Sequence, residues 1–452
     1  MRTGASQSNE KPPPEQTSIT RLELEKKIRS HSATVGVIGL GFVGLSLAVE
    51  MAKAGFRVKG IDIEAGIVNA VNAGISDNFD VPSDELFPLV ATDRIKASQS
   101  LATVAELDAV SICVPTLLRK TKEPYLSYLV AAIEAIRNHL RPGQVIVLES
   151  TAYPGATREL VLPILEESGL QVGEDFFLAY SPQRLDPGNP TYSSRNIPKI
   201  MSGMTPHCTE LAVLFYRQFI ETVIAVSSLE TAELVKLLEN TFSSVNIAIA
   251  NEMTLISHKL GINVWEVIEA AQSKPFGFMA FYPGPGLGGD CLPIDARYPT
   301  SNTRMNGFRP RLIELASEIN SQMFSFIIER VADALNGKGK SLKHSKILVL
   351  GVSYKRDSNE FRDPRAIEVI RGLQQKGGAI FYADPYVKSI EIDGAPMRSI
   401  QLTADVVESM DCVILLTDHS GFDYAMIAAH DVLTIDGRNG FKDFSRPNII
   451  PL

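Results

Sequence analysis

The sequence predicts an α/β protein with two Rossmann-like, doubly wound parallel-sheet domains joined by a central helical segment. Two observations carry this prediction. Near-continuous apolar runs of strand length alternate with helical patterns in the first and last parts of the chain, which is typical of buried parallel strands. Between these parts the strand signals fade, and apolar residues recur at helical spacing. With 452 residues, the chain is long enough for two or three domains.

The N-terminal half is expected to contain a tail and the first α/β domain. Residues 1–30 are polar and Pro-rich at their start, which predicts a disordered tail, with a short charged helix possible at its end. The first domain is placed at residues 31–227. Its strands are expected in the runs ATVGVIGL, RVKGIDI, DAVSICVPT and QVIVLEST.

The C-terminal half is expected to begin with helices. Residues 228–336 form the predicted central helical domain, with helices over 228–261, 263–273 and 311–335. Residues 337–452 form the second α/β domain, which is smaller. Its strands are expected in the runs KILVLGVSY, AIFYADPY, DCVILLTD and DVLTIDGRN.

Composition excludes several classes of function. The net charge is −8, and the sequence has no cluster of Lys and Arg, so we expect no nucleic-acid partner. The four cysteines are scattered and have no metal-ligand spacing, so we expect no metal site and reduced thiols in the cytoplasm. No apolar run reaches membrane-spanning length, and the N-terminus lacks the apolar core of a signal peptide.

A glycine-rich turn follows the first predicted strand directly. In the run GLGFVG, Gly39 permits the tight turn, Gly41 lets the backbone approach a pyrophosphate, and Gly44 allows close packing of helix on strand. Asp62, at the end of the second strand, suits both ribose hydroxyls and would repel a 2′-phosphate. This favours NAD, although nearby Lys59 leaves NADP open, and Asp62 could instead be a strand-end cap.

Two further patterns suggest catalysis. Cys291 lies among glycines in the run PGPGLGGDCLPID, and the proline two positions later suits the first turn of a helix. A thiol at a helix N-terminus favours the nucleophilic thiolate, whereas the plainer alternative is a buried bystander cysteine. Lys236 and Asn240 are four residues apart and share one helix face. Beside a nicotinamide they can polarise a reacting oxygen, whereas the alternative is a solvated helix face.

Taken together, these motifs resemble those of the UDP-glucose/GDP-mannose (nucleotide-sugar 6-) dehydrogenase family. The resemblance spans residues 35–440 and rests on motifs in the family's order, which are GLGFVGL, VPT, ESTAYPGAT, SPQRLDPGN, KLLENTFSSVNIAIANE, PGPGLGGDCLPID and LGVSYK. The forms SPQRLDPG and FYPGPGLGG are most similar to the UDP-N-acetylhexosamine branch.

The resemblance implies a four-electron oxidation of the sugar C6 alcohol to a carboxylate, with two NAD and one water, in polysaccharide biosynthesis. Cys291 would hold a thiohemiacetal and then a thioester. Lys236 and Asn240 would stabilise the oxyanions, Asp295 would act as acid/base, and Thr151 would position water. The resemblance also implies a homodimer through the central domain. The cofactor contacts implied are Gly39, Gly41, Phe42, Val43, Gly44, Asp62, Pro115, Thr116, Thr151 and Arg362. The substrate contacts implied are Arg184, Lys236, Asn240, Phe281, Tyr282, Gly288, Lys355 and Arg438.

Four departures from the family pattern cluster around these residues. Gln183 stands where the family usually has the Glu that serves as a base for hydrolysis, and Asp290 replaces a His beside Cys291. Ala296 and Arg297 replace a Pro and an aromatic residue, and FRDP replaces LRES. Neutral drift, an altered substrate or reaction, and loss of activity all remain open.

Several functional alternatives therefore stay beside a UDP-N-acetylhexosamine 6-dehydrogenase. A close one is oxidation of UDP-glucose or another nucleotide sugar. A β-hydroxyacid dehydrogenase shares the N-terminal fold and a Lys–Asn helix, but it needs neither Cys291 nor a second nucleotide-binding domain. A non-catalytic nucleotide-sugar-binding protein would have no need to retain Cys291, Lys236, Asn240 and Asp295 together.

Overall fold

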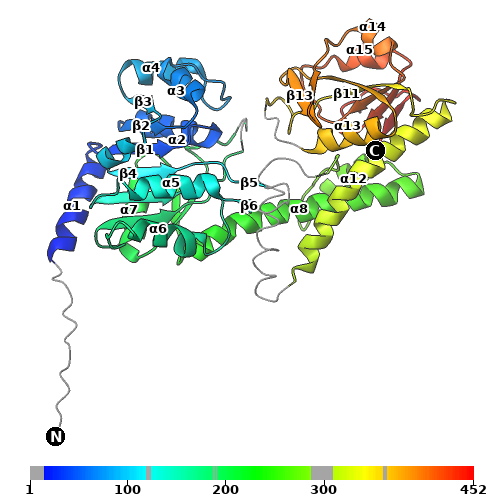
Figure 1. Ribbon diagram of the computed structural model, residues 1–452. Coiled ribbons are helices and arrows are strands. Elements are labelled where there is room, and N and C mark those ends of the chain that lie inside the picture. The colour runs from blue at the N-terminus through cyan, green and yellow to red at the C-terminus, as the bar shows by residue number, and fades with distance from the viewer. Residues whose placement is uncertain (1–14, 119–123, 187–188, 190, 287–308, 360–363) are drawn as a thin grey trace. The chain divides into compact units, whose positions relative to one another are not determined.

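The computed structural model describes residues 15–118, 124–186, 189, 191–286, 309–359 and 364–452. The chain divides into two compact units, one running to Lys236 and the other from Leu237 to Leu452. Each unit contains one large sheet (Figure 1). The second unit combines the predicted central and C-terminal domains, and the division falls inside a long helix. Among the described residues, no helix has both the length and the apolar character needed to cross a membrane.

The first unit is built on an eight-stranded sheet with the strand order β10-β9-β8-β7-β4-β1-β2-β3. Only the β8/β9 pair is antiparallel, and the strand order reverses between β1 and β4. The carboxyl ends of these two strands therefore form a switch point, where doubly wound sheets bind ligands. The strands are β1 (Thr34–Ile38), β2 (Arg57–Ile61), β3 (Ile95–Ser98), β4 (Ala109–Ile112), β7 (Gln144–Leu148), β8 (Phe176–Tyr180), β9 (Lys199–Gly203) and β10 (Val223–Ala225).

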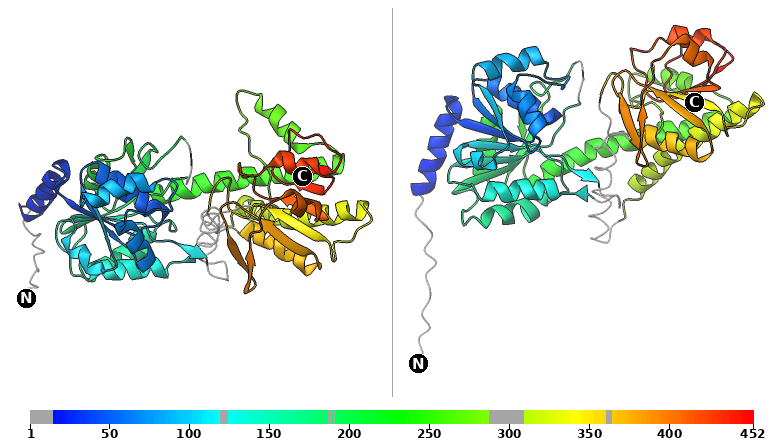
Figure 2. Two further views of the ribbon diagram at one scale, coloured as in Figure 1. Left: turned by 90° about the horizontal axis from the view of Figure 1, so that it is seen from above. Right: turned by 45° about the horizontal axis from the view of Figure 1, so that its top comes forward.

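Helices cover both faces of this sheet because alternate strand residues point to opposite sides (Figure 2). In β7, for example, Val145 and Val147 pack in the core that includes α7, while Ile146 and Leu148 pack in the core that includes α5. The helices of this unit are α1 (Glu15–Arg29), α2 (Phe42–Lys53), α3 (Ala65–Asn72), α4 (Ser83–Ala91), α5 (Ser127–Arg137), α6 (Leu162–Glu166) and α7 (Pro206–Tyr216).

Helix α1 contains the short charged helix expected at the end of the tail, and it corrects the prediction of disorder because it begins at Glu15. Leu24 and Ile28 are buried in the same core as α2 and α7. Lys27 pairs with Asp108, and Arg21 pairs with Glu210 on α7. The sequence reads as polar here because only one narrow stripe of the helix is apolar, which is too little to outweigh the charged residues around it.

The second unit contains a five-stranded, fully parallel sheet with the order β12-β11-β15-β16-β17. Its strand order reverses between β11 and β15, which makes a second switch point. The strands are β11 (Lys346–Leu350), β12 (Ala379–Ala383), β15 (Cys412–Leu415), β16 (Leu433–Asp436) and β17 (Ile449–Pro451), beside a small hairpin of β13 (Ser389–Ile392) and β14 (Ala395–Arg398). One face packs on α12 (Arg311–Gly337) and α13 (Pro364–Gln375), the other on α14 (Ala404–Glu408) and α15 (Tyr424–Ala429).

The central helices are α8 (Leu229–Leu260), α9 (Val264–Gln272) and α12 (Arg311–Gly337). A buried hydrogen bond of 2.8 Å from Asn251 to Asn320 joins α8 to α12, and α12 also packs on α13. The three predicted helices are confirmed to within two residues at each end, and all eight predicted strand runs contain a strand. The α/β fold with two doubly wound sheets and a central helical segment is therefore confirmed.

Candidate active site

The glycine turn lies at the first switch point, between β1 and α2. Gly39 has a φ of +90°, and a Cβ there would lie 2.7 Å from the carbonyl oxygen of Cys113, so only glycine fits. A Cβ on Gly44 would lie 1.8 Å from the carbonyl oxygen of Gly39. A Cβ on Gly41 would meet no atom within 4 Å. Gly39 and Gly44 thus lie where a side chain would not fit, and Gly41 faces open space where a pyrophosphate can approach the backbone.

Asp62 connects the end of β2 to this turn. Its Oδ2 accepts a 2.7 Å hydrogen bond from the Leu40 amide, and its Oδ1 accepts one from the Glu64 amide. Each carboxylate oxygen keeps a lone pair for a ribose hydroxyl, so the strand-end cap and the cofactor contact are compatible. Lys59, which left NADP open in the sequence, forms an ion pair with Glu106. The Asp62 carboxylate, as an acceptor for two ribose hydroxyls, fits NAD.

The segments that follow β4 and β7 adjoin the same switch point. Pro115 and Thr116 come after β4, and Thr151 comes after β7 with only 8% of its surface exposed. Ser150 donates a 2.7 Å hydrogen bond to the Val114 carbonyl oxygen, which joins the two segments. The first unit therefore brings the predicted cofactor contacts Pro115, Thr116 and Thr151 to the edge of the sheet that carries the glycine turn.

Gln183 lines a small cavity in the first unit, together with Val43, Glu149, Arg184 and Lys199. The Gln183 side-chain oxygen accepts a 2.8 Å hydrogen bond from the Arg184 amide, and the Arg184 guanidinium donates to the Pro198 carbonyl oxygen. Gln183, which stands where a base is expected, thus lies beside Val43 at the start of α2. The predicted substrate contact Arg184 lines the same cavity.

Sequence reasoning missed the buried polar network beneath this cavity. Glu149 is 1% exposed, accepts a 2.6 Å hydrogen bond from Tyr216, and forms an ion pair with Lys199. Burial and the neighbouring Glu149 carboxylate raise the pKa of Tyr216, so its hydroxyl stays protonated and donates. A Glu directly after the apolar strand β7 was the available signal, since an acid buried there needs a cationic partner.

Lys236 and Asn240 lie on the same face of α8, one turn apart, as predicted. Only 9% of the Lys236 surface is exposed, which contradicts the alternative of a solvated helix face for this lysine. Glu233, one turn earlier, accepts hydrogen bonds from the amides of Gly155 and Thr157 and from the Thr157 hydroxyl. Burial raises the pKa of Glu233. These bonds attach the first turns of α8 to the first unit and so fix the position of Lys236.

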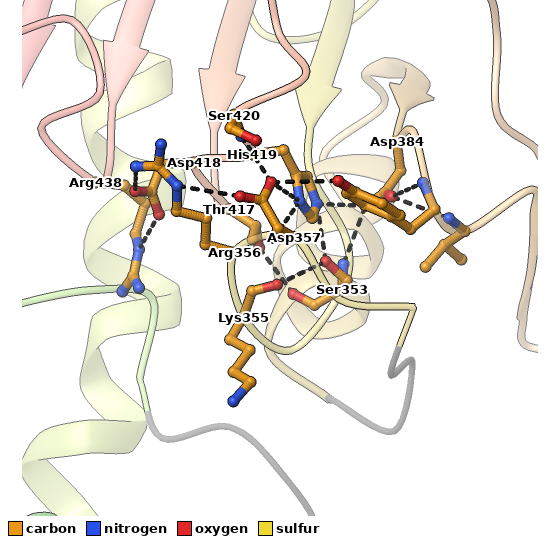
Figure 3. Close-up of polar contacts among 12 residues, drawn as sticks. Ser353, Lys355, Arg356, Asp357, Asp384, Thr417, Asp418, His419, Ser420 and Arg438 are labelled. Carbon is orange, nitrogen blue, oxygen red and sulfur yellow. Dashed lines mark hydrogen bonds and ion pairs between the residues drawn. The ribbon is translucent and has the colours of Figure 1, made fainter. Parts of the chain in front are cut away.

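A second polar cluster occupies the switch point of the C-terminal sheet (Figure 3). It joins the segment after β11, which carries Ser353, Lys355 and Asp357, to the segment after β15, which carries Thr417 and His419. Asp384, after β12, accepts hydrogen bonds from four backbone amides, those of Val352, Ser353, Tyr386 and Val387. Burial works to raise the pKa of Asp384, but the His419 and amide hydrogen bonds lower it overall.

The two predicted cations of this cluster sit on turns held by buried carboxylates. Lys355 follows β11 within the segment bound by Asp384. Arg438 follows β16, and the Asp436 carboxylate accepts hydrogen bonds from the amides of Arg438, Gly440 and Phe441. The Arg438 guanidinium also lies 3.6 Å from Asp418. Two cationic side chains at a sheet switch point can bind a diphosphate.

The Phe281–Tyr282 segment packs on the central helices of the same unit. Phe281 packs against Phe242, and Tyr282 stacks on Trp265. The Gly284 amide donates to Asn251, and a Cβ on Gly284 would lie 2.6 Å from the Arg438 guanidinium. The side chains of Phe281 and Tyr282 thus fix the segment, and the backbone at Gly284 adjoins Arg438.

The remaining predicted residues Cys291, Asp295, Gly288 and Arg362 lie outside the described residues, as do Asp290, Ala296 and Arg297. The three described cysteines are poor candidates for a nucleophile. Burial raises the pKa of the Cys113 and Cys412 thiols, and Cys208, on α7, is fully buried in the core. Within the described ranges, no group of three or more His, Cys, Asp and Glu side chains is arranged to hold a metal ion.

Comparison with known proteins identifies the family. Three domain models of the UDP-glucose/GDP-mannose dehydrogenase family match in order: the NAD binding domain over residues 33–220, the central domain over 230–322, and the UDP binding domain over 348–443. The chain belongs to this family. It is an NAD-dependent nucleotide-sugar dehydrogenase, and the glycine turn with Asp62 lies within the region matched as the NAD binding domain.

Similar proteins and solved structures agree with this assignment. A UDP-N-acetyl-D-glucosamine 6-dehydrogenase from Pseudomonas aeruginosa is 33% identical, over 86% of this chain and 91% of that protein. The structure of a UDP-D-ManNAc dehydrogenase from Pyrococcus horikoshii matches with a TM-score of 0.84 and 30% identity, over 92% of this chain and 98% of the other. A UDP-glucose dehydrogenase from Pyrobaculum islandicum matches with a TM-score of 0.81 and 25% identity, over 93% and 96%.

Proposed function

We propose that this protein oxidises the C6 hydroxymethyl group of a UDP-N-acetylhexosamine to the uronic acid. The main support is the second switch point, where Lys355 and Arg438 sit on turns held by buried carboxylates in a region matched as a UDP binding domain. Relatives named for N-acetylglucosamine and N-acetylmannosamine favour that sugar class. The Pyrobaculum islandicum relative makes UDP-glucose the second candidate. Because a β-hydroxyacid dehydrogenase needs no UDP binding domain, that alternative has lost its support.

The proposed chemistry proceeds in two oxidations. NAD⁺ bound at the glycine turn would accept a hydride in each of them. The first converts the alcohol to an aldehyde, and the Cys291 thiolate adds to its carbonyl carbon to form a thiohemiacetal. The second gives a thioester, which water hydrolyses to the carboxylate and the free thiol. Because the carbonyl stays bonded to sulfur, it cannot diffuse away while the reduced cofactor is exchanged.

The other proposed roles follow from charge and position. The ammonium of Lys236 and the amide of Asn240, on one face of α8, would stabilise the oxyanions formed at C6. Asp295 would act as acid and base, and Thr151 would position the hydrolytic water. Arg184, Phe281, Tyr282 and Gly288 would contact the sugar nucleotide, and Arg362 would reach the cofactor.

We also propose a homodimer through α8. Exposed apolar side chains recur along one side of this helix at intervals of three, four and seven residues, at Leu238, Phe242, Ile249, Met253, Ile256 and Leu260, with 38% to 66% of each exposed. A stripe of this spacing is typical of a helix face that packs on another helix. A second copy of the chain would cover this stripe, since the family resemblance implies a homodimer through the central domain.

The dimer proposal predicts that sedimentation gives twice the mass of one chain. Ile249→Glu, which places a charge in the middle of the stripe, should give monomers, because burying an unpaired carboxylate in the interface carries a large desolvation free energy. Leu22→Glu on α1 is the matched control, since Leu22 is 51% exposed and Ile249 is 55% exposed. This control should remain dimeric. A wild-type monomer at micromolar concentration would disprove the proposal.

The substrate proposal is tested with a panel of UDP-sugars in an assay for NADH. We expect the highest kcat/KM with a UDP-N-acetylhexosamine, and a uronic acid as the product. UDP alone should compete with the sugar nucleotide, because Lys355 and Arg438 would bind the diphosphate that both ligands share. Preference for UDP-glucose would assign the second candidate, and no turnover of any UDP-sugar would refute the proposal.

A further inference from the structure

His419 is the buried centre of the C-terminal polar cluster (Figure 3). Its side chain is 0% exposed, and its ring packs between Tyr386 and Phe422, with centroid distances of 5.1 and 5.4 Å. A histidine with no access to solvent must have both ring nitrogens satisfied by the protein. The partners of these two nitrogens define what the residue does.

The two nitrogens have opposite roles. Nδ1 lies 2.9 Å from the backbone nitrogen of Asp357. Because a backbone N–H can only donate, Nδ1 accepts and carries no proton. The neutral ring therefore carries its proton on Nε2, which lies 3.1 Å from Asp384 Oδ2 and 2.8 Å from the Ser353 hydroxyl. One nitrogen is bound to the Asp384 anchor, and the other holds the Asp357 amide.

Asp357 is a position that needs such support. Its φ is +54°, in the left-handed region that residues other than glycine adopt only rarely. A residue in this conformation persists only where its surroundings fix it. Here the Asp357 amide is bound by His419, and its carboxylate accepts a 2.7 Å hydrogen bond from the Ser420 amide.

Lys355 lies between the two points at which His419 holds this segment. Ser353 contacts His419 Nε2 through its hydroxyl, which also lies 3.2 Å from the Lys355 carbonyl oxygen. Asp357, two residues after Lys355, contacts Nδ1. One imidazole therefore contacts residues on both sides of Lys355, namely the side-chain hydroxyl of Ser353 and the backbone amide of Asp357.

We infer that His419 is a positioning residue for the nucleotide site, and that its Nδ1 holds the turn that presents Lys355 to the substrate diphosphate. This inference rests on the proposed function, because it assigns a role to the site at which UDP would bind. His419 itself does not contact the nucleotide. Because His419 fixes the turn before the nucleotide binds, less conformational entropy is lost on binding.

Two variants separate the roles of the two nitrogens. In His419→Asn the amide oxygen takes the place of Nδ1 and can still accept from the Asp357 amide. In His419→Gln the longer side chain reaches the place of Nε2, and the Asp357 amide loses its acceptor. His430→Gln, in the same unit but outside the cluster, is the matched control. The measurement is calorimetric binding of UDP, together with steady-state kinetics.

We expect His419→Gln to bind UDP roughly 10-fold or more weakly, because an amide without its acceptor favours rearrangement of the turn. KM for the UDP-sugar should rise in parallel, while kcat at saturation and KM for NAD stay unchanged. His419→Asn should bind within about threefold of wild type, because it keeps the contact with the Asp357 amide. It loses the Nε2 contacts with Asp384, which still accepts from four backbone amides, and with Ser353, whose hydroxyl still lies 3.2 Å from the Lys355 carbonyl oxygen. His430→Gln should match wild type.

Other results would overturn the inference. Wild-type UDP affinity in a folded His419→Gln variant would show that Nδ1 does not position the site. Equal weakening in both variants, with equal loss of thermal stability, would show a structural role alone. If neither variant folds, ¹⁵N NMR of the wild-type imidazole decides, because an Nδ1 that accepts from the Asp357 amide carries no proton. Failure of wild type to bind UDP would instead refute the proposed function, and this inference with it.

Discussion

Cys291→Ser should reduce formation of the uronic acid by at least ~10³-fold, the scale of losses seen when a catalytic nucleophile is removed. A serine hydroxyl is almost entirely protonated at neutral pH, whereas a cysteine thiol ionises far more readily. The first oxidation does not need the thiol. The variant can therefore still form NADH in a single turnover with the aldehyde, but it should not proceed to the thioester.

The measurement is the yield of uronic acid and of NADH in single-turnover and steady-state reactions. Cys208→Ser is the matched control, because Thr205 lies within hydrogen-bond distance of the Cys208 sulfur and a hydroxyl can keep that contact. The control should retain activity, since Cys208 is buried in the core of the first unit. Wild-type yield of uronic acid from Cys291→Ser would contradict the covalent mechanism.

The second large effect is expected at Gln183. Its amide cannot take a proton at neutral pH, and loss of one positioned base typically costs ~10²–10⁴ in rate. Glu149 lines the same cavity but should not replace the base, because Tyr216 and Lys199 engage its two oxygens. We therefore expect both oxidations to be faster than hydrolysis of the thioester. Stopped-flow measurement of NADH should show a burst followed by a slow steady state.

Gln183→Glu should then increase the slow rate and reduce the burst, because it restores a carboxylate where the family usually has one. Lys199 and Arg184 line the same cavity and would offset the added negative charge. Gln375→Glu, at an exposed position on α13, is the control for the change of charge and should keep the burst. A linear trace from wild type, with full turnover, would show that hydrolysis is not slowed.

The fold was predictable because its signals are local. Parallel strands such as β1 and β11 are buried on both faces and so form short, continuous apolar runs, and α8 has a helical pattern over more than thirty residues. The roles expected of Gly39, Gly41 and Gly44 followed from their spacing alone, and the structure shows the positive φ of Gly39 and the close contact at Gly44. Membership of the family was predictable for the same reason, since its motifs are contiguous.

Features that depend on contacts between distant segments were not predictable. Helix α1 is ordered by two buried side chains, Leu24 and Ile28, within a mostly charged segment. The Glu149–Lys199 pair and the His419–Asp384 pair join residues that are 50 and 35 positions apart. No short-range pattern indicates such pairs, because their members come together only when the sheets are assembled.

The central claim is that one active site carries out two successive oxidations of the same carbon. The most direct test is the amount of NADH formed per UDP-sugar consumed, measured at completion with limiting sugar nucleotide. Two NADH per sugar, with the uronic acid as the product, is the predicted result. One NADH per sugar, with an aldehyde released into solution, would contradict the claim.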